Sequence, residues 1–508
     1  MLLSNAAAVL HGDWLDNLLN HAQRPEVGLV GAKLLAADNT IQHAGLILGQ
    51  QEPVTHVFHG QNASSDGYMH RLVVDQNYSA VSDACLMIGS ALYEALDGMD
   101  EGDFSDCYGD VDLCLRVKES GRLIVWTPHV VLLHEPTADP QDAPDQRAKD
   151  ALCRRWLNYI AHDPAYNDNF STKSEGLQLE TFTQVTWRPL TWRPVPVVLS
   201  HPFDLSISGT RLQAPLDALA EELQIEHVRS PEWLTIGEFA RLNPETVVVQ
   251  RPWTDQAISD LKSVKSLSKA LRVYDVSEYP HSAEHRRDLL KTGFGLMDKV
   301  IVASPGLAEV LSEFHAHILI IEERLAPRWR NVQCYSLPHR KPRVGWVGTH
   351  AQLNELALIE DVIKSLAQEV EWVIMGPCPE ALRPYVHEWR SSVEGELYPG
   401  VLGCLDLDVA LIPAGNSLIG EHKSTRLALE FGACGYPVIA SDVQGLRNGL
   451  PLTRVQNTTA AWREAIAMHI NDLDESKRLG QVLKDKVLSD WMLDEAQLQH
   501  WYAALLDR

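Results

Sequence analysis

Three charged residues in the last quarter of the chain have the types and spacing needed to recognise a nucleoside diphosphate. Lys423 and Arg426 place two cations at the start of an expected helix, where the backbone dipole already favours anions. Glu430 follows about two turns later and falls on nearly the same face as Lys423. A cation for the diphosphate and a carboxylate for the ribose hydroxyls would then stand at a fixed separation.

The alternative for this segment is an exposed amphipathic helix with ordinary ion pairs. The residues that follow favour the first interpretation. Gly432 and Gly435 allow close packing, and 437–441 reads as a buried strand.

A glycine-bearing turn forms the second candidate site, in the segment GWVGTHAQLNE that begins at Gly345. Gly345 and Gly348 permit a tight turn and close backbone approach, and the free amides of a following helix would attract a phosphate. A plain strand-to-helix turn is equally compatible, because short Gly-x-x-Gly pieces are common. His350 fits a ligand contact or a helix-start residue.

Alternating strands and helices are expected to position both candidates. The expected strands are 195–199, 246–249, 272–275, 299–303, 343–347, 371–375, 409–412 and 437–441, and the expected helices include 254–266, 283–292, 355–366, 379–387 and 424–434. This rhythm indicates parallel sheets with crossover helices, hence an α/β fold. Two successive doubly wound units usually hold a ligand at their strand ends, although two-domain binding proteins share that architecture.

Changes in composition suggest four segments along the 508 residues. They are an α/β region over 1–137, a helical segment and linker over 138–195, a Rossmann-like domain over 196–335, and a second Rossmann-like domain over 336–508 with a helical tail.

Bulk composition excludes several classes of protein. With 44 basic and 68 acidic residues, the net charge of -24 argues against binding to nucleic acid. The eight cysteines form no C-x-x-C pair, and no stretch reaches the roughly 20 apolar residues that span a bilayer. We expect a cytoplasmic protein, and the sequence leaves open whether it binds peripherally to the inner membrane.

The segments GWVGTH, EWVIMGPCPEALRPYV and KSTRLALEFGACGYPVIASD, in this order, resemble the C-terminal half of GT-B glycosyltransferases. They are most similar to those in multidomain bacterial proteins that build O-antigen or other surface polysaccharides. The similarity extends back through GTRLQAPLDAL, VYDVSEYP and EERLAPRW, over about 200 to 505.

The resemblance implies a donor site for a nucleoside diphosphate sugar, with no cofactor and no metal requirement. Lys423 and Arg324 would grip the diphosphate, Glu430 would bind the ribose, and Gly348, Thr349, His350 and Ser424 would lie near the phosphates. Many such enzymes carry a second Glu, and its position here falls on His422, beside Glu421. This departure leaves the sugar-contacting acid open.

The first 137 residues resemble something else, the acceptor-side half of a GT-A, family-two-type glycosyltransferase. The similar segments are DWLDNLLNHAQRPEVGLVGAKLL, TIQHAGLILG, YSAVSDACLMI and YGDVDLCLRVKESGRLIVWTPHVVLLHEPT. The resemblance implies that Asp110 occupies the place of the general base and His134 that of a metal ligand. From the residues alone, Asp110 could equally cap a helix.

Departures from that family predict an inactive N-terminal part. The family's metal-binding acids fall on Asn5, Ala6, Ala7 and Ala8, and methyl groups cannot bind a hard cation. The nucleotide-binding first hundred or so residues of that fold would precede Met1. We therefore expect no donor binding in 1–137, although Asp110, Asp112, Arg116 and His134 are retained.

The leading hypothesis is a metal-independent GT-B glycosyltransferase preceded by a truncated GT-A remnant. Its acceptor would be a carbohydrate or a lipid-linked glycan. Association with a polysaccharide-synthesis complex is left open. His281 is the candidate catalytic base, although a lone His is more often structural. The alternative is a noncatalytic carbohydrate-binding or assembly scaffold derived from transferases. A periplasmic-type binding protein is disfavoured, because no export signal is recognised.

Overall fold

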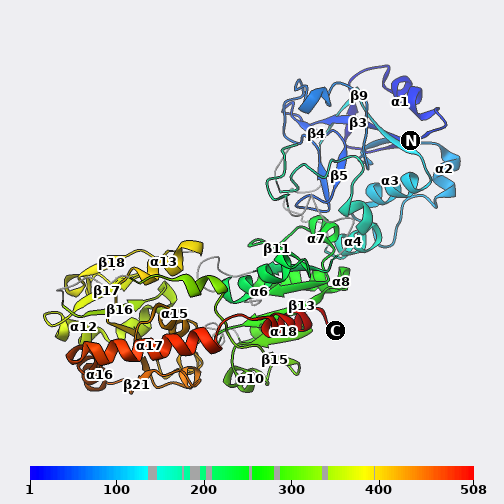
Figure 1. Ribbon diagram of the computed structural model, residues 1–508. Helices are drawn as coiled ribbons and strands as arrows, with labels where there is room; N and C mark the ends of the chain where they lie inside the picture. The colour runs from blue at the N-terminus through cyan, green and yellow to red at the C-terminus, as the bar shows by residue number, and fades with distance from the viewer. Residues whose placement is uncertain are drawn as a thin grey trace. The chain divides into compact units, whose positions relative to one another are not determined.

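A computed structural model describes most of the chain, namely residues 1–135, 146–173, 177–183, 195–201, 209–250, 254–279, 287–334, 341–393 and 395–507. The chain forms two compact units (Figure 1). The first unit comprises 1–194 with 234–243 and 266–268, and the second comprises 195–233, 244–265 and 269–508.

The first unit is built on a mixed seven-stranded sheet. Its centre is β3, whose nine residues are all buried, paired in parallel with β9. The order is β1-β8-β3-β9-β2, with β4 on β3 and β7 on β9, while β5 and β6 form a separate pair. The strands are β1 (Leu2–Leu3), β2 (Ala7–Val9), β3 (Val27–Leu35), β4 (Ile41–His43), β5 (Leu46–Leu48), β6 (Val54–His56), β7 (Gln76–Asn77), β8 (Cys85–Ile88) and β9 (Leu123–His134).

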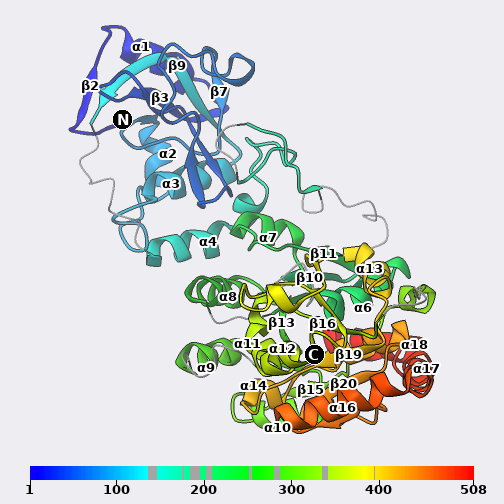
Figure 2. The ribbon, with the colours of Figure 1, turned by 90° about the vertical axis from the view of Figure 1, so that its left-hand side faces the viewer.

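The helices of the first unit include one in the segment expected to be a helical region and linker, and one, α7, from later in the chain. They are α1 (Trp14–Ala22), the 3-10 turn η1 (Tyr68–His70), α2 (Ser90–Ala95), α3 (Gly109–Glu119), α4 (Gln146–Ala161) and α7 (Ile236–Leu242). Trp156 and Tyr166 are buried in the same core as the sheet. Helix α7 packs beside α4 (Figure 2), and its Glu238 accepts a hydrogen bond from the Thr172 hydroxyl at 2.6 Å. Part of the expected linker is thus folded onto the first unit.

The second unit contains two six-stranded sheets in which every pairing is parallel, confirming the predicted α/β class and its doubly wound sheets. The first has the order β11-β10-β12-β13-β14-β15 and the second β18-β17-β16-β19-β20-β21. The strands are β10 (Val197–His201), β11 (Glu226–Arg229), β12 (Thr246–Val249), β13 (Leu271–Val276), β14 (Lys299–Val302), β15 (Ile318–Ile320), β16 (Arg343–Val347), β17 (Glu371–Met375), β18 (Glu388–Arg390), β19 (Val409–Ile412), β20 (Val438–Ser441) and β21 (Thr453–Val455).

Crossover helices connect these strands, and the chain ends in three helices. They are α6 (Gly209–Glu221), α8 (Asp255–Leu267), α9 (Arg287–Gly295), α10 (Pro305–Leu311), α11 (Leu353–Ala357), α12 (Glu360–Leu366), α13 (Tyr398–Gly403), α14 (Leu418–Glu421), α15 (Arg426–Cys434), α16 (Thr459–Asn471), α17 (Leu473–Asp490) and α18 (Glu495–Leu506). Short 3-10 turns are η2 (Pro327–Asn331), η3 (His350–Gln352), η4 (Arg383–Tyr385), η5 (Gly395–Leu397) and η6 (Gln444–Leu446).

Two segments differ from the sequence prediction. Residues 379–387 hold only the turn η4 instead of a helix, because Pro384 cannot donate the backbone bond that a helix interior needs. Helix α18 packs against α6 and β13 of the first sheet (Figure 1), where Trp501 and Leu505 join the core around Val198. The last helix therefore belongs to the first sheet's core, although the sequence pattern placed it with the second domain.

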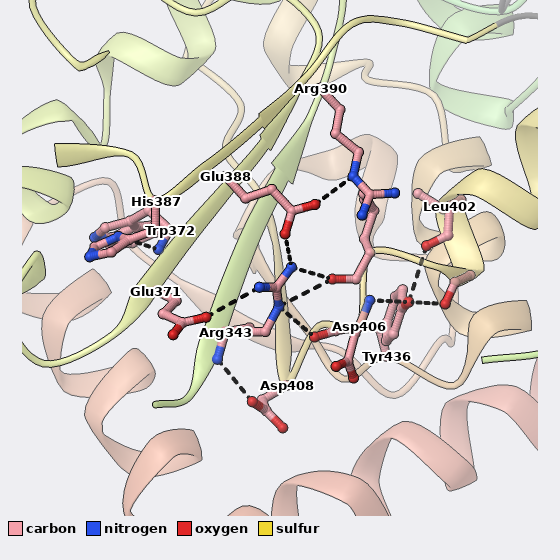
Figure 3. A network of polar contacts seen from close by, with 12 residues as sticks. Arg343, Glu371, Trp372, His387, Glu388, Arg390, Leu402, Asp406, Asp408 and Tyr436 are labelled. Atoms are coloured by element: carbon pink, nitrogen blue, oxygen red, sulfur yellow. Dashed lines mark hydrogen bonds and ion pairs between the residues drawn. The ribbon is translucent and has the colours of Figure 1, made fainter. Parts of the chain in front are cut away.

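A polar network closes the amino ends of β16, β17 and β18 (Figure 3). Arg343 donates to Glu371 at 3.2 Å and to Glu388 at 2.5 Å, and its backbone amide donates to Asp408 at 2.8 Å. Arg390 also donates to Glu388, at 2.5 Å. Ligands of parallel sheets bind at the carboxyl ends of strands, so this network at the opposite ends is structural.

No helix in the described ranges combines the length and apolar character needed to cross a membrane.

Candidate functional site

The candidate site lies where segments following the two parallel sheets of the second unit meet. Glu323 follows β15 of the first sheet, and Ser424 lies just before α15 of the second. The Ser424 hydroxyl donates to the Glu323 carboxylate at 2.5 Å. This hydrogen bond joins the two halves at the place where doubly wound folds hold their ligands.

Lys423 is buried in this site and is paired with an acid. Its ammonium donates to the carboxylate of Glu355, on α11, and only 5% of the lysine side chain is exposed. Burial raises the pKa of Glu355, the charge of Lys423 opposes that rise, and the nearby Glu278 adds to it. The cation predicted to hold a diphosphate is therefore paired with a carboxylate of the protein itself.

Arg426 and Glu430 also pair with each other. The Arg426 Nε donates to Glu430 at 2.7 Å, and the Tyr398 hydroxyl donates to the other carboxylate oxygen at 3.0 Å. Glu430 is only 1% exposed. Both oxygens are thus engaged inside the protein, and the contact of Glu430 with a ribose stays a prediction that requires its side chain to turn.

Arg211, on α6, has a buried guanidinium group with one unused hydrogen-bond donor. Its Nε donates to Asp275 at 3.0 Å and one terminal nitrogen donates to the carbonyl of Ile321 at 2.6 Å. The other terminal nitrogen, Nη1, is buried and has no hydrogen-bond partner within the described part of the chain.

Four arginines converge on one small pocket beside these pairs. Arg211, Arg324, Arg328 and Arg426 line it together with Glu323. Arg426, like Arg211, keeps a buried Nη1 without a partner among the described residues. Burial raises the pKa of Glu323, and the charge of Arg211 partly offsets that effect. Buried guanidinium groups with free N–H donors are suited to an oxyanion or to ordered water.

Arg324 lines that pocket, and its contact with a donor diphosphate stays a prediction. Its guanidinium stands 4.6 Å from the centre of the Trp491 ring and donates to Glu322 at 3.1 Å. Stacking on the ring fixes the plane of the guanidinium group, which is the geometry that bidentate phosphate recognition uses.

The turn after β16 is a capped turn followed by short helices. The amide of Thr349 donates to the side chain of Gln352 at 3.0 Å, completing a capping box. His350 is exposed, and only the three-residue η3 and the five-residue α11 follow. Gly348 donates its amide to Met375 at 3.1 Å. The geometry matches the plain strand-to-helix turn more closely than an amide cradle for phosphate.

His422 takes the place of the expected acid and faces the first sheet's side of the site. It is 4% exposed, and a Cβ on Gly306, in α10, would lie 3.1 Å from its Nδ1. Burial lowers the pKa of His422, while the neighbouring Glu421 opposes that effect. His281, the candidate base, lies outside the described residues.

The first unit brings its candidate residues to one edge. Strand β2 pairs with β9 so that Ala7 stands opposite His134. The amide of Asp83 donates to Asp110 at 3.3 Å, and the charge of Asp83 also acts on His134. Burial, with a smaller contribution from Asp83, raises the pKa of Asp110 to about 7.

Asp112 and Arg116 have structural partners. Asp112 is fully buried and accepts hydrogen bonds from Arg116 at 2.8 Å and from the Trp156 indole at 2.9 Å, joining α3 to α4. Within the described ranges no group of three or more His, Cys, Asp or Glu side chains is arranged to hold a metal ion.

Several site residues were not singled out from the sequence. Glu323 and Arg211 lie inside the segments EERLAPRW and GTRLQAPLDAL, so those segments contained a signal for them. Glu355 likewise ends the segment GWVGTHAQLNE, whereas Tyr398 lies outside the quoted segments, and the contacts of both depend on residues 68 and 32 positions away.

No protein-family model matches the chain. It is 38% identical over 190 residues to the uncharacterized protein y4gI of Sinorhizobium fredii (strain NBRC 101917 / NGR234), covering 35% of this chain and 21% of that protein. It is 34% identical over 185 residues to the O-antigen biosynthesis protein RfbC of Myxococcus xanthus, covering 34% of this chain and 14% of that protein. The matched stretches thus span about a fifth or less of these relatives' own length.

Similar solved structures include a glycosyltransferase from Rickettsia africae ESF-5, with a TM-score of 0.43 and 15% identity over 62% of this chain and 100% of that one. Another is the catalytic domain of starch synthase IV from Arabidopsis thaliana, bound to ADP and acarbose, with a TM-score of 0.42 and 10% identity over 62% of this chain and 99% of that one. A third is an alpha-glucosyltransferase in complex with UDP and DNA, with a TM-score of 0.47 and 9% identity over 61% of this chain and 98% of that one.

Proposed function

We propose that the second unit is a glycosyltransferase that takes a sugar from a nucleoside diphosphate donor and passes it to a carbohydrate or lipid-linked acceptor. The observation that carries the proposal is the buried Lys423, next in sequence to a residue bonded to Glu323 of the arginine pocket, where Arg211 and Arg426 each have an unused, buried guanidinium N–H donor. The similarity to an O-antigen biosynthesis protein supports surface polysaccharide synthesis as the setting.

The residues of the site suggest how the donor would be bound. A diphosphate entering the site would replace Glu355 as the partner of Lys423, since both groups are anions that the same ammonium can pair with. The arginine pocket would accept further phosphate oxygens. When the sugar leaves, these fixed cations stabilise the charge that develops on the departing diphosphate, the task that a divalent cation performs in other transferases.

In this proposal the first unit takes no part in donor chemistry. Ala7 faces His134 where the metal-binding acid of the family would stand, and its methyl group offers no ligand. Asp110 and His134 would then be relics, and His281 would remain the candidate base of the second unit.

Donor turnover tests the proposal. The full chain is incubated with uridine, guanosine and thymidine diphosphate sugars, with Mn²⁺ or with EDTA, and released nucleoside diphosphate is measured. We expect release from at least one donor, persisting in EDTA and lost in the Lys423→Met variant. Absence of release and of binding for every donor would overturn the proposal.

One observation favours a second candidate, a noncatalytic carbohydrate-binding or assembly scaffold. Lys423 and Arg426 are already neutralised by Glu355 and Glu430, as in a site that no longer binds a charged donor. A scaffold would show neither hydrolysis nor transfer, and its glycan binding would be indifferent to added nucleotide.

A further inference from the structure

A groove in the first unit is lined by residues that the proposed donor chemistry does not use. It is a shallow depression open to solvent, with a volume of about 1100 Å³, between two segments, one over 68–76 and the other over 162–170. We call it the aromatic groove. Its lining residues are Tyr68, Met69, Arg71, Gln76, His162, Asp163, Pro164, Ala165, Tyr166, Asn167, Asp168 and Phe170.

Aromatic rings from both segments meet in this groove. Tyr68 stands edge-on to Phe170, with ring centres 5.6 Å apart, and Phe170 lies 5.7 Å from Tyr166. Tyr68 is 43% exposed, so part of its ring is available to a ligand. Aromatic faces and edges of this kind combine a large apolar surface with a polar hydroxyl.

Planar polar side chains surround the rings. The Arg71 Nε donates to the Gln76 side chain at 3.0 Å in a partly buried contact, and the exposed His162 pairs with Asp168 at 3.2 Å. Asn167 lies between them along the chain. Carboxylate, amide and guanidinium groups each offer two donors or acceptors side by side, which suits neighbouring hydroxyl groups. The groove carries both signs of charge, so it lacks the uniform positive potential that an anionic polymer requires.

One side of the groove is held in a strained conformation. Met69 and His70 both adopt positive φ angles, 51° and 60°, which residues with side chains seldom do. Such a conformation persists only where the surrounding structure enforces it. Met69 is nevertheless 77% exposed.

The other side is fixed by a buried acid. Asp163 is 2% exposed and accepts hydrogen bonds from the amides of Leu48 at 2.7 Å and Ala165 at 2.8 Å, and from the Ser79 hydroxyl. These bonds anchor the 162–170 segment to the core of the first unit. A preformed groove binds a ligand without the cost of ordering a loop.

We propose that the aromatic groove binds a neutral oligosaccharide. Rings contact the apolar C–H faces of sugar units, while Arg71, Asn167 and Asp168 contact their hydroxyl groups. This inference goes beyond the proposed donor chemistry, because it concerns the first unit and gives that unit a function that does not require the lost metal-binding acids.

Saturation-transfer NMR on the full chain tests the inference with four probes: maltohexaose, mannohexaose, cellohexaose and chitohexaose. We expect transfer to at least one hexasaccharide, and loss of most of that transfer in Tyr68→Ala and Asn167→Ala. Met468→Ala, which shortens an exposed apolar side chain on α16, should leave the signal unchanged.

Nucleoside diphosphate binding, measured on the same samples, separates this inference from the proposed function. Tyr68→Ala should keep its nucleotide affinity and its thermal unfolding midpoint while losing the sugar signal. Absence of transfer to all four probes would overturn the inference, as would transfer that survives both groove variants.

Discussion

At the scale of single residues, the pairing of Lys423 with Glu355 decides how the candidate site behaves. Lys423 was predicted as a donor-binding residue from its place at the start of an expected helix, and the structure shows that it is buried. Its partner could not be predicted, because an acid 68 positions earlier leaves no trace in local spacing. The same holds for Tyr398 at Glu430. Sequence thus indicates which charges are present, and only packing shows how they are neutralised.

Nucleotide affinity is predicted to change with pH through Glu355. Burial raises the pKa of this carboxyl, so it takes up a proton at a higher pH than an exposed glutamate does. Protonation frees Lys423 for the ligand, and the affinity for nucleotide should therefore rise as the pH falls. Titration calorimetry of wild type and Glu355→Gln at several pH values measures the nucleotide affinity. The variant should lack the part of the pH dependence that Glu355 causes. Identical pH profiles would contradict the prediction.

Cys334 is predicted to be the most reactive thiol among the described cysteines. A hydrogen bond with the Cys434 thiol lowers the pKa of Cys334 to about 7, against the opposing effect of burial, and Lys484 contributes in the same direction as the hydrogen bond. The thiolate is the nucleophile, so at pH 7.5 Cys334 should react with iodoacetamide before the other exposed cysteine, Cys404. Peptide mass spectrometry over time follows both sites. Faster labelling of Cys404 would contradict the assignment.

At the scale of elements, the start of α15 depends on a glycine in a neighbouring turn. A Cβ on Gly445 would lie 2.3 Å from the carbonyl oxygen of Lys423, a separation that real structures do not show. Thr425 donates to the Gly445 carbonyl at 3.3 Å, so the two segments are held together. The backbone that presents Lys423 is therefore fixed by this contact.

Gly445→Ala should displace Lys423 and weaken nucleotide binding without removing any charge. Gly400→Ala is the matched control, because nothing lies within 4 Å of its Cβ position and it is also in the second unit. Calorimetry should show weaker binding only for Gly445→Ala, with both variants folded by circular dichroism. Equal affinity in the two variants would show that Lys423 is held by other contacts.

The strands and crossover helices of the second unit were predictable, whereas two details of the elements were not. Apolar runs bounded by polar helices gave the parallel strands near their observed positions. The helix expected at 379–387 failed because Pro384 removes a backbone donor within it. Of the two alternatives for the turn after Gly348, the sequence could not show that the Gln352 side chain accepts the Thr349 amide, and a phosphate contact at this turn stays a prediction.

At the scale of the whole molecule, the first unit contains Asp110 and His134, which the resemblance matches to a general base and a metal ligand, but it is predicted to contribute no donor chemistry. Asp110→Asn should leave donor turnover unchanged within error, because the charges that would bind the diphosphate lie in the second unit. The measurement is diphosphate release by wild type and variant under identical conditions. A strong loss of turnover would contradict this prediction and indicate that the first unit takes part in donor chemistry.

Long-range packing sets the limit of prediction at this scale. Residues 163–173 look like a polar linker, yet Asp163 and Tyr166 are buried in the first unit. Helix α18 follows the second sheet in sequence, yet Trp501 packs into the core of the first. Local composition cannot register such contacts, because the partners lie far apart along the chain.

Nucleoside diphosphate binding by variants of one ion pair tests the central claim most directly. Glu355→Gln removes the competing anion, and Lys423→Met combined with Glu355→Gln removes the cation without leaving a buried charge unpaired. Calorimetry with uridine, guanosine and thymidine diphosphates should show tighter binding of one of them to Glu355→Gln than to wild type. The double variant should bind that nucleotide at least about tenfold more weakly than Glu355→Gln, since it lacks one charge-assisted contact. Equal affinity of a folded double variant and Glu355→Gln would contradict the assignment of the donor site to Lys423.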